Sequence, residues 1–67
     1  MIALTINGEP RSFEDNLTVA ELIEKLRLGG KRVALERNGQ IVPRGGFASE
    51  RLADGDRLEI VVAVGGG

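Results

Sequence analysis

The stretch LADGDRLEIVVAVGGG, residues 52–67, combines a polar turn, the most apolar run of the chain and three closing glycines. Asp54-Gly55-Asp56 is interpreted as a turn, because tight turns favour aspartate and glycine. The run from Arg57 to Val64 is predicted to be a strand, since its apolar residues are bounded by turn signals. The glycines of residues 65–67 leave directly from this apolar strand. A frayed chain end usually follows a polar stretch, so we interpret these glycines as functional.

Two hairpins precede this strand, and each is built around an Asn-Gly pair, Asn7-Gly8 and Asn38-Gly39. Both residue types tolerate the positive φ that a two-residue type I′ turn requires. Apolar alternation, clearest at Ile2, Leu4 and Ile6, predicts strands on either side of each turn. We expect these strands at residues 2–6 and 9–13, from Val33 and Leu35 onward, and at residues 41–42.

A helix is predicted between the two hairpins. Thr18 and Glu21 have the spacing of a capping box, in which each side chain satisfies a free N–H at the helix start. The residues that follow form one apolar stripe at helical spacing, Val19, Leu22, Ile23 and Leu26. We expect Gly29-Gly30 to end the helix in a left-handed C-cap.

The prolines indicate how the strands are arranged. Pro10 and Pro43 lack the N–H that a central strand needs, so the outer strand of each hairpin is expected at a sheet edge. The first, third and last strands then occupy the middle of the sheet. One helix covering one face of five strands predicts a two-layer α+β domain. The pattern does not fix the order of the central strands. Phe47 and Leu52 are expected to anchor the loop before the last strand.

The composition excludes several classes of protein. The 67 residues contain no cysteine and no histidine, which removes disulfides, thiolate metal sites and the commonest acid–base catalyst. The hydroxyls have no candidate base, so an enzyme acting alone is the least favoured reading. Asp54 and Asp56 alone make a poor cation site, so no metal is expected. The arginines at 32, 37, 44, 51 and 57 are interpreted mainly as solvated charges.

The net charge of −1 provides no strong attraction to nucleic acid or to a membrane surface. The first residues do not have the pattern of a signal peptide. No apolar run approaches the ~20 residues that span a bilayer. We therefore expect a cytoplasmic protein that binds neither nucleic acid nor membrane.

The element order and motifs together resemble the ThiS family of sulfur carriers, which has the ubiquitin-like β-grasp fold. The resemblance rests on four stretches, Ile6–Glu9, Glu36–Arg44, Leu52–Val61 and Val64–Gly67. It implies a mixed five-stranded sheet in which the last strand lies between the first and the third. It also implies a β-grasp domain at residues 1–64 and a flexible functional tail, Gly65, Gly66 and Gly67.

The resemblance implies a protein cosubstrate with no bound cofactor and no catalytic residue of its own. A ThiF-like adenylyltransferase would consume ATP to join AMP to the Gly67 carboxylate. Sulfur from a cysteine-desulfurase-type donor system would displace AMP and leave a thiocarboxylate. A thiazole synthase would then accept the sulfur for the thiazole ring of thiamin. Glycine suits such a tail because without Cβ it can thread a narrow tunnel.

One surface is a candidate for docking these partners. If Leu58, Ile60 and the other even-numbered residues of the last strand face the helix, Val61 and Ala63 point outward. We expect them to lie beside Ala3, Thr5 and Ala34. An exposed apolar patch next to a functional tail is a plausible partner-binding surface.

Three other functions fit parts of the sequence. The small subunit of molybdopterin synthase uses the same thiocarboxylate, although those chains tend to be longer and to end in a double glycine. A ubiquitin-like protein modifier would use the same activated tail to join target lysines. A plain binding module, such as a small RNA-associated β-grasp domain, would tolerate loss of the tail, and the near-neutral charge counts against it.

Overall fold

The computed structural model describes residues 1–63 of the chain, and the predicted tail, residues 65–67, lies outside this part. The helix α1 spans Val19–Lys25, and a short 3₁₀ turn, η1, spans Arg44–Gly46. The strands are β1 (Ile2–Ile6), β2 (Glu9–Phe13), β3 (Val33–Arg37), β4 (Gln40–Val42) and β5 (Arg57–Val62). The predicted strands are therefore all present. β4 begins one residue before its predicted start, and β5 ends at Val62, so the prediction that Ala63 belongs to the last strand is wrong.

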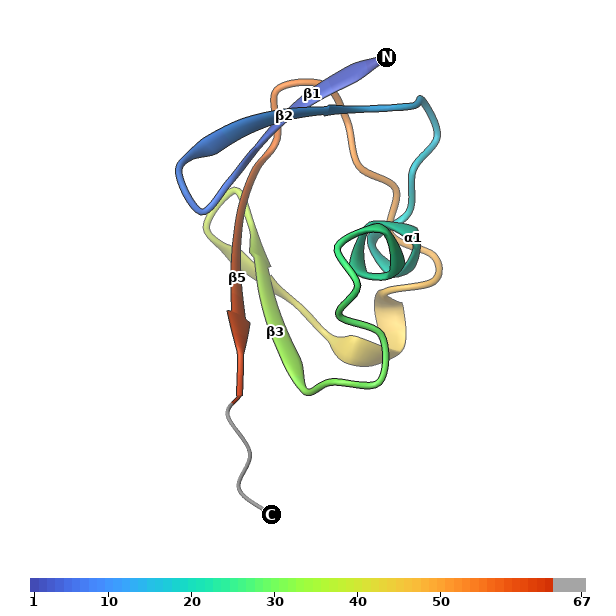
Figure 1. Cartoon of the computed structure of the whole chain (residues 1–67), viewed down its shortest axis with the longest axis vertical. Coiled ribbons are helices and arrows are strands. Elements are labelled where there is room, and N and C mark those ends of the chain that lie inside the picture. Colours follow the sequence, from blue (N-terminus) through green and yellow to red (C-terminus); the bar gives the residue numbers. More distant parts are fainter. Residues whose placement is uncertain (64–67) are drawn as a thin grey trace.

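The strands form one sheet in the order β2-β1-β5-β3-β4 (Figure 1). β5 runs parallel to β1 and antiparallel to β3, so the sheet is mixed. Pro10 lies in edge strand β2, and Pro43 directly follows edge strand β4. The prediction that prolines mark the edges is confirmed, and β5 has the central place that the resemblance implies.

Both Asn-Gly pairs form the predicted turns. Asn7 and Gly8 have φ values of 51° and 84°, and Asn38 and Gly39 have φ values of 52° and 86°. Positive φ at both central residues is the requirement of a type I′ turn, whose twist matches that of the flanking strands. Each pair therefore sets the register of its hairpin.

The helix starts as predicted and ends earlier than predicted. The Thr18 side chain accepts from the Glu21 N–H, and the Glu21 carboxylate accepts from the Thr18 N–H at 2.9 Å. At the other end, Arg27 takes the left-handed conformation with φ of 61°, and the Leu28 N–H donates to Ile23 O at 2.9 Å. This is a Schellman motif, in which Arg27 stands where glycine is usual. The prediction that Gly29-Gly30 forms the C-cap is wrong.

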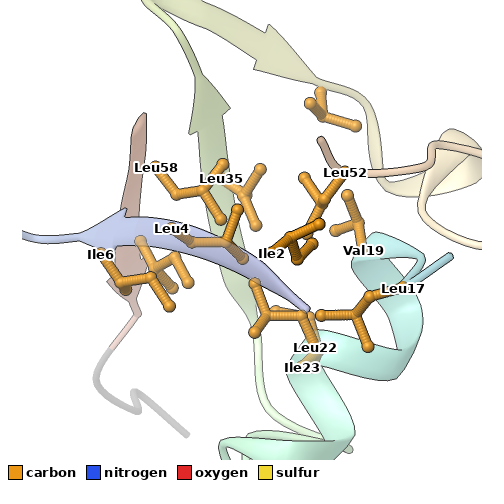
Figure 2. Close-up of a cluster of buried hydrophobic side chains, with 12 residues drawn as sticks. Ile2, Leu4, Ile6, Leu17, Val19, Leu22, Ile23, Leu35, Leu52 and Leu58 are labelled. Atoms are coloured by element: carbon orange, nitrogen blue, oxygen red, sulfur yellow. The ribbon is translucent and has the colours of Figure 1, made fainter. Parts of the chain in front are cut away.

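The core lies between α1 and the face of the sheet that α1 covers (Figure 2). Twelve buried apolar residues form one cluster, and they come from the helix, from four strands and from two loop positions. Among the most deeply buried are Leu4, Leu17, Val19, Leu22, Leu35 and Leu58. Truncating a buried leucine to alanine costs about 2–5 kcal/mol. This single two-layer core confirms the predicted α+β architecture.

The long loop before β5 is tied to the start of α1. Backbone bonds join the Val19 N–H to Glu50 O and the Ala20 N–H to Phe47 O, each at 2.9 Å. Leu52 is buried in the core and Phe47 packs partly against it, as the two predicted anchors should. Across residues 1–63, no helix is long and apolar enough to cross a membrane.

Candidate functional site

The site is the end of β5, because the C-terminal residues that carry the predicted chemistry follow this strand directly. Val62 pairs with Val33 of β3. One residue further, the Ala63 N–H donates to Arg32 O at 2.9 Å. The three glycines themselves lie beyond residue 63. The structure therefore describes the base from which they leave.

The side of β5 that faces β1 is held by an unexpected side chain. The Ile60 N–H donates to Asn7 Oδ1 at 2.7 Å, and Asn7 Nδ2 donates to Ile60 O at 3.0 Å. We call this pair of bonds the Asn7 clamp. Sequence reasoning missed it, because Asn7 was fully explained by the φ that its turn requires. The repeated choice of asparagine before glycine was the only available signal.

The start of β5 is held by a buried carboxylate. Asp56 is only 7% exposed, and it accepts from Arg37 Nε at 2.7 Å and from the Ala53 N–H at 2.8 Å. Asn38 Nδ2 donates to it at 3.0 Å, and the Arg57 N–H donates to Asn38 Oδ1 at 2.9 Å. The side chain of each turn asparagine therefore binds β5, Asn38 near its start and Asn7 near its end.

Arg37 is not the solvated charge that the sequence predicted. Its Nη1 donates to a Glu50 carboxylate oxygen at 2.7 Å, while its Nε binds Asp56. Arg37 therefore joins β3 to the long loop and to the turn before β5. The hydrogen bond to Glu50 and the neighbouring Asp56 raise the pKa of Arg37 despite its partial burial.

The same contacts control the charge of Asp56. Burial alone would raise the pKa of this carboxyl, because it disfavours the charged form. Hydrogen bonds from Ala53, Asn38 and Arg37 act in the opposite direction, and together they outweigh burial. The pKa of Asp56 therefore lies below its usual value. A buried carboxylate with this many donors is a structural anchor.

The outer face of the sheet, opposite α1, carries part of the predicted docking surface. Val61 is 64% exposed, and Ala34 lies directly opposite it on β3. Ala63 is also exposed and lies two residues further toward the tail. These three predicted residues are brought together at the end of β5.

Ala3 and Thr5 lie elsewhere, so the expectation that they adjoin Val61 and Ala63 is wrong. β1 runs parallel to β5, which places Thr5 opposite Arg57 and Ala3 against the turn, where Ala3 O accepts from the Gly55 N–H. At about 3.3 Å per residue, Ala63 lies about 20 Å along β5 from Arg57. Apolar alternation does not reveal strand direction, and this caused the error.

Ile41 is an exposed apolar residue that sequence reasoning did not assign to the surface. It is 75% exposed on edge strand β4, whereas its neighbour Val42 is buried. Its partner on β3 is Glu36, which also faces Glu59 of β5. Ile41 therefore shares the outer face with Val61, but it lies two strands and one row of paired residues away, and Glu36 and Glu59 lie in its own row. We call Ala34, Ile41, Val61 and Ala63 the apolar patch.

The turn at Asp54-Gly55-Asp56 behaves as a turn. Asp54 Oδ1 accepts from the Ala3 N–H at 2.7 Å, and Gly55 has a φ of 89°. Within residues 1–63, no three histidine, cysteine, aspartate or glutamate side chains are grouped so that they could hold a metal ion. Both aspartates of this turn are used in bonds to the protein itself.

Comparison with known protein families identifies the family to which this sequence and fold belong. The sequence model of the ThiS family matches residues 4–67, which is nearly the whole chain and includes all three closing glycines. The chain belongs to the ThiS family. The crystal structure of a thiamine biosynthesis protein (ThiS) from Geobacter metallireducens is similar, with a TM-score of 0.83 and 33% sequence identity. That match covers 98% of this chain and all of the other.

Relatives from other organisms have informative names. A sulfur carrier protein ThiS from Bacillus subtilis is 35% identical, over 96% of this chain and 98% of its own length. A thiazole synthase from Paramagnetospirillum magneticum is 47% identical over 96% of this chain. This chain spans only 20% of the length of that synthase. A ThiS-like segment therefore also occurs inside a larger protein that is named for thiazole formation.

These matches confirm the predicted family and the β-grasp fold. They also support the interpretation of the chain as a sulfur carrier of thiamin biosynthesis, a cosubstrate and not an enzyme.

Proposed function

We propose that this protein carries sulfur for the thiazole ring of thiamin as a thiocarboxylate on Gly67. The observation that carries the proposal is the ThiS family match, which extends to the last glycine of the chain. The fold supports it, because the central strand of the sheet leads directly to that glycine. Such a strand is a firm base for a reactive group that must be presented to other proteins.

The chemistry needs an activation step outside this chain. A carboxylate is a poor electrophile, so Gly67 must first attack the α-phosphorus of ATP, releasing pyrophosphate and forming an acyl adenylate. Hydrosulfide can then attack the acyl carbon, so that AMP leaves and the thiocarboxylate forms directly. A persulfide in its place would form an acyl disulfide with loss of AMP, and a thiol would then have to reduce that disulfide to the thiocarboxylate. The product is a thiocarboxylate whose sulfur can be passed on. The chain itself binds no cofactor in this scheme, and ATP is consumed by the activating partner.

Three partners follow from these steps. A ThiF-like adenylyltransferase activates Gly67, a cysteine-desulfurase-type system supplies the sulfur, and a thiazole synthase accepts it. The occurrence of a ThiS-like segment within a thiazole synthase supports the last partner, because fusion keeps carrier and acceptor together. We place this exchange in the cytoplasm.

The apolar patch is the surface through which we expect the adenylyltransferase to recognise the folded domain. Three extended residues reach only about 10 Å, so the domain must dock close to the partner's active site. Val61 and Ala63 lie nearest to the tail, and Ile41 offers the largest exposed side chain of the patch. Exposed apolar side chains on the face that carries the end of β5 suit a partner of matching apolar surface.

The mass of the intact protein tests the proposed chemistry. We expect chain isolated from cells that also contain the adenylyltransferase and a sulfur donor to be heavier by the difference between sulfur and oxygen. Deletion of Gly67 should abolish this species. Unmodified protein under these conditions, with no acyl adenylate, would contradict sulfur carriage.

The docking surface has a matched control on the same face of the sheet. Val61→Asp places a charge in the apolar patch, whereas Ser12→Asp places the same charge on edge strand β2, where Ser12 pairs with Ala3. Both positions are exposed, so stability should change by less than about 0.5 kcal/mol in each. We expect adenylation to slow only in the Val61 variant. Equal rates in the two variants would remove the patch from the proposal.

A further inference from the structure

The Asn7 clamp extends the pairing of β5 beyond the end of β1. The backbone of Asn7 still takes part in the parallel ladder, since its N–H donates to Leu58 O at 2.9 Å. Its φ of 51° then turns the chain away into the hairpin. In a continuing ladder, the next N–H and C=O of β5 would both bond to backbone groups of the neighbouring strand. Here the side-chain amide of Asn7 supplies the acceptor and the donor, so it replaces one peptide unit.

The position of the clamp connects it to the tail. Among residues 1–63, Ile60 is the last residue of β5 that is bonded from the β1 side. On the β3 side, the last bond that the described residues make is that of the Ala63 N–H to Arg32 O. The base of the tail is therefore held by one anchor on each side. Without the clamp, the end of β5 would be held from the β3 side alone.

We infer that Asn7 is a positioning residue, which orients the end of β5 so that Gly67 is delivered to the adenylating partner. This inference rests on the proposed function. A chain of seven residues, the number that separates Ile60 from Gly67 in the sequence, spans at most about 25 Å, so the direction of β5 at Ile60 matters for delivery to a docked partner. A base already held in the productive direction reduces the ordering cost of docking. A small misplacement of a reacting group can lower a rate by as much as about a hundredfold.

The second Asn-Gly turn provides a matched control. Asn7→Gly and Asn38→Gly each create a Gly-Gly pair that still permits a type I′ turn. Each substitution also removes two side-chain hydrogen bonds. Asn7→Gly removes both bonds to the Ile60 backbone, and Asn38→Gly removes the bonds to the Asp56 carboxylate and to the Arg57 N–H. The two variants differ in place, because Asn38 holds the start of β5 and Asn7 holds the end.

The first measurement is amide hydrogen exchange of Ala63, whose own bond to Arg32 is on the other side of β5 from the clamp. Relative to the slowest-exchanging amides of the sheet, we expect its exchange to quicken about tenfold in Asn7→Gly, as the loss of two hydrogen bonds suggests. Asn38→Gly should change this ratio by less than about twofold. An unchanged ratio in Asn7→Gly would overturn the inference.

The second measurement is kcat/KM for adenylation of Gly67 by the enzyme that activates the wild-type chain. We expect a fall of about tenfold in Asn7→Gly and less than about twofold in Asn38→Gly. Faster exchange at Ala63 with unchanged kcat/KM would reduce Asn7 to a purely structural role and overturn the inference. If Asn7→Gly does not fold, Asn7→Asp takes its place, since it keeps an acceptor for the Ile60 N–H and loses the donor.

The two proposals fail in different ways. A wild-type chain that no adenylating enzyme activates would contradict the proposed function. If the wild-type chain is activated and the two glycine variants have equal kcat/KM, only the proposed role of Asn7 is contradicted, and the proposed function stands.

Discussion

The two ends of β5 are held by different means. At its start, the buried carboxylate of Asp56 collects donors from Arg37, Asn38 and the Ala53 backbone. At its end, neutral hydrogen bonds hold the strand, from Asn7 on one side and to Arg32 on the other. The contacts at the start therefore involve charged groups and stabilise the fold, whereas the contacts at the end mainly fix the direction in which the strand leaves the sheet. This difference suits a strand whose first half belongs to the core and whose last residues, in the proposed function, are presented to partners.

The largest expected effect is at the start of the strand. Asp56→Ala would leave the Ala53 N–H, the Asn38 amide and one side of the Arg37 guanidinium without their acceptor. We expect a loss of about 3 kcal/mol in the free energy of unfolding, measured by urea denaturation. Asp54→Ala is the control, because within residues 1–63 exposed Asp54 accepts from the Ala3 N–H alone, and its substitution should cost about 1 kcal/mol. Equal losses would contradict the contrast between the two ends.

The same carboxylate predicts how stability depends on pH. The pKa of Asp56 is lower in the folded protein than in the unfolded chain. Its contribution to stability is therefore fully present above the unfolded value of about 3.9, and it is lost as pH falls through that value toward the folded pKa. We expect the urea concentration at the unfolding midpoint of the wild type to decrease as the pH is lowered below about 4. It should fall less steeply in Asp56→Ala, and identical slopes would assign the acid sensitivity to other carboxyls.

A smaller effect is expected at the end of the strand. Ala63→Pro removes the N–H that donates to Arg32 O. Ala63 is exposed and follows the last residue of β5, so we expect a loss of about 1 kcal/mol in the free energy of unfolding. Ala63→Ser keeps the N–H and is the control. A loss as large as that of Asp56→Ala would show that the two ends contribute equally to stability.

The smallest effect is expected in the middle of β5, where Glu59 lies directly opposite Glu36 of the neighbouring strand β3. Like charges directly opposite one another destabilise a sheet, whereas opposite charges stabilise it. We expect Glu59→Lys to raise the free energy of unfolding by about 0.5 kcal/mol at low salt. High salt should remove most of this gain, because it screens exposed charges. A gain that persists at high salt would need another explanation.

Much of the fold was predictable because local signals agreed with one another. The Asn-Gly turns, the edge prolines and the Thr18–Glu21 capping box each determine a feature within a few residues of themselves. The Arg27 C-cap was not predictable in this way. Glycine is the preferred residue at that position, so Gly29-Gly30 was a misleading signal.

The contacts of the candidate site were less predictable, because they join residues far apart in the sequence. Asn7 and Ile60 are separated by 53 positions, and Arg37 and Asp56 by 19. The parallel direction of β1 and β5 places Ala3 away from Val61, and no apolar pattern contains that information. Residues 65–67 were recognised from their composition and place in the sequence, and their role as a tail stays a prediction.

The clamp also has a consequence for the chemical ageing of the protein. In an Asn-Gly sequence, the unhindered glycine nitrogen can attack the asparagine side-chain carbonyl and expel ammonia. Water then opens the resulting succinimide ring to aspartate or isoaspartate. The two hydrogen bonds to Ile60 restrict rotation of the Asn7 side chain and so slow this reaction in the folded protein. Once deamidated, Asn7 would present a carboxylate to Ile60 O and lose its donor. Old molecules would then keep a nearly intact core while the end of their last strand had lost its support.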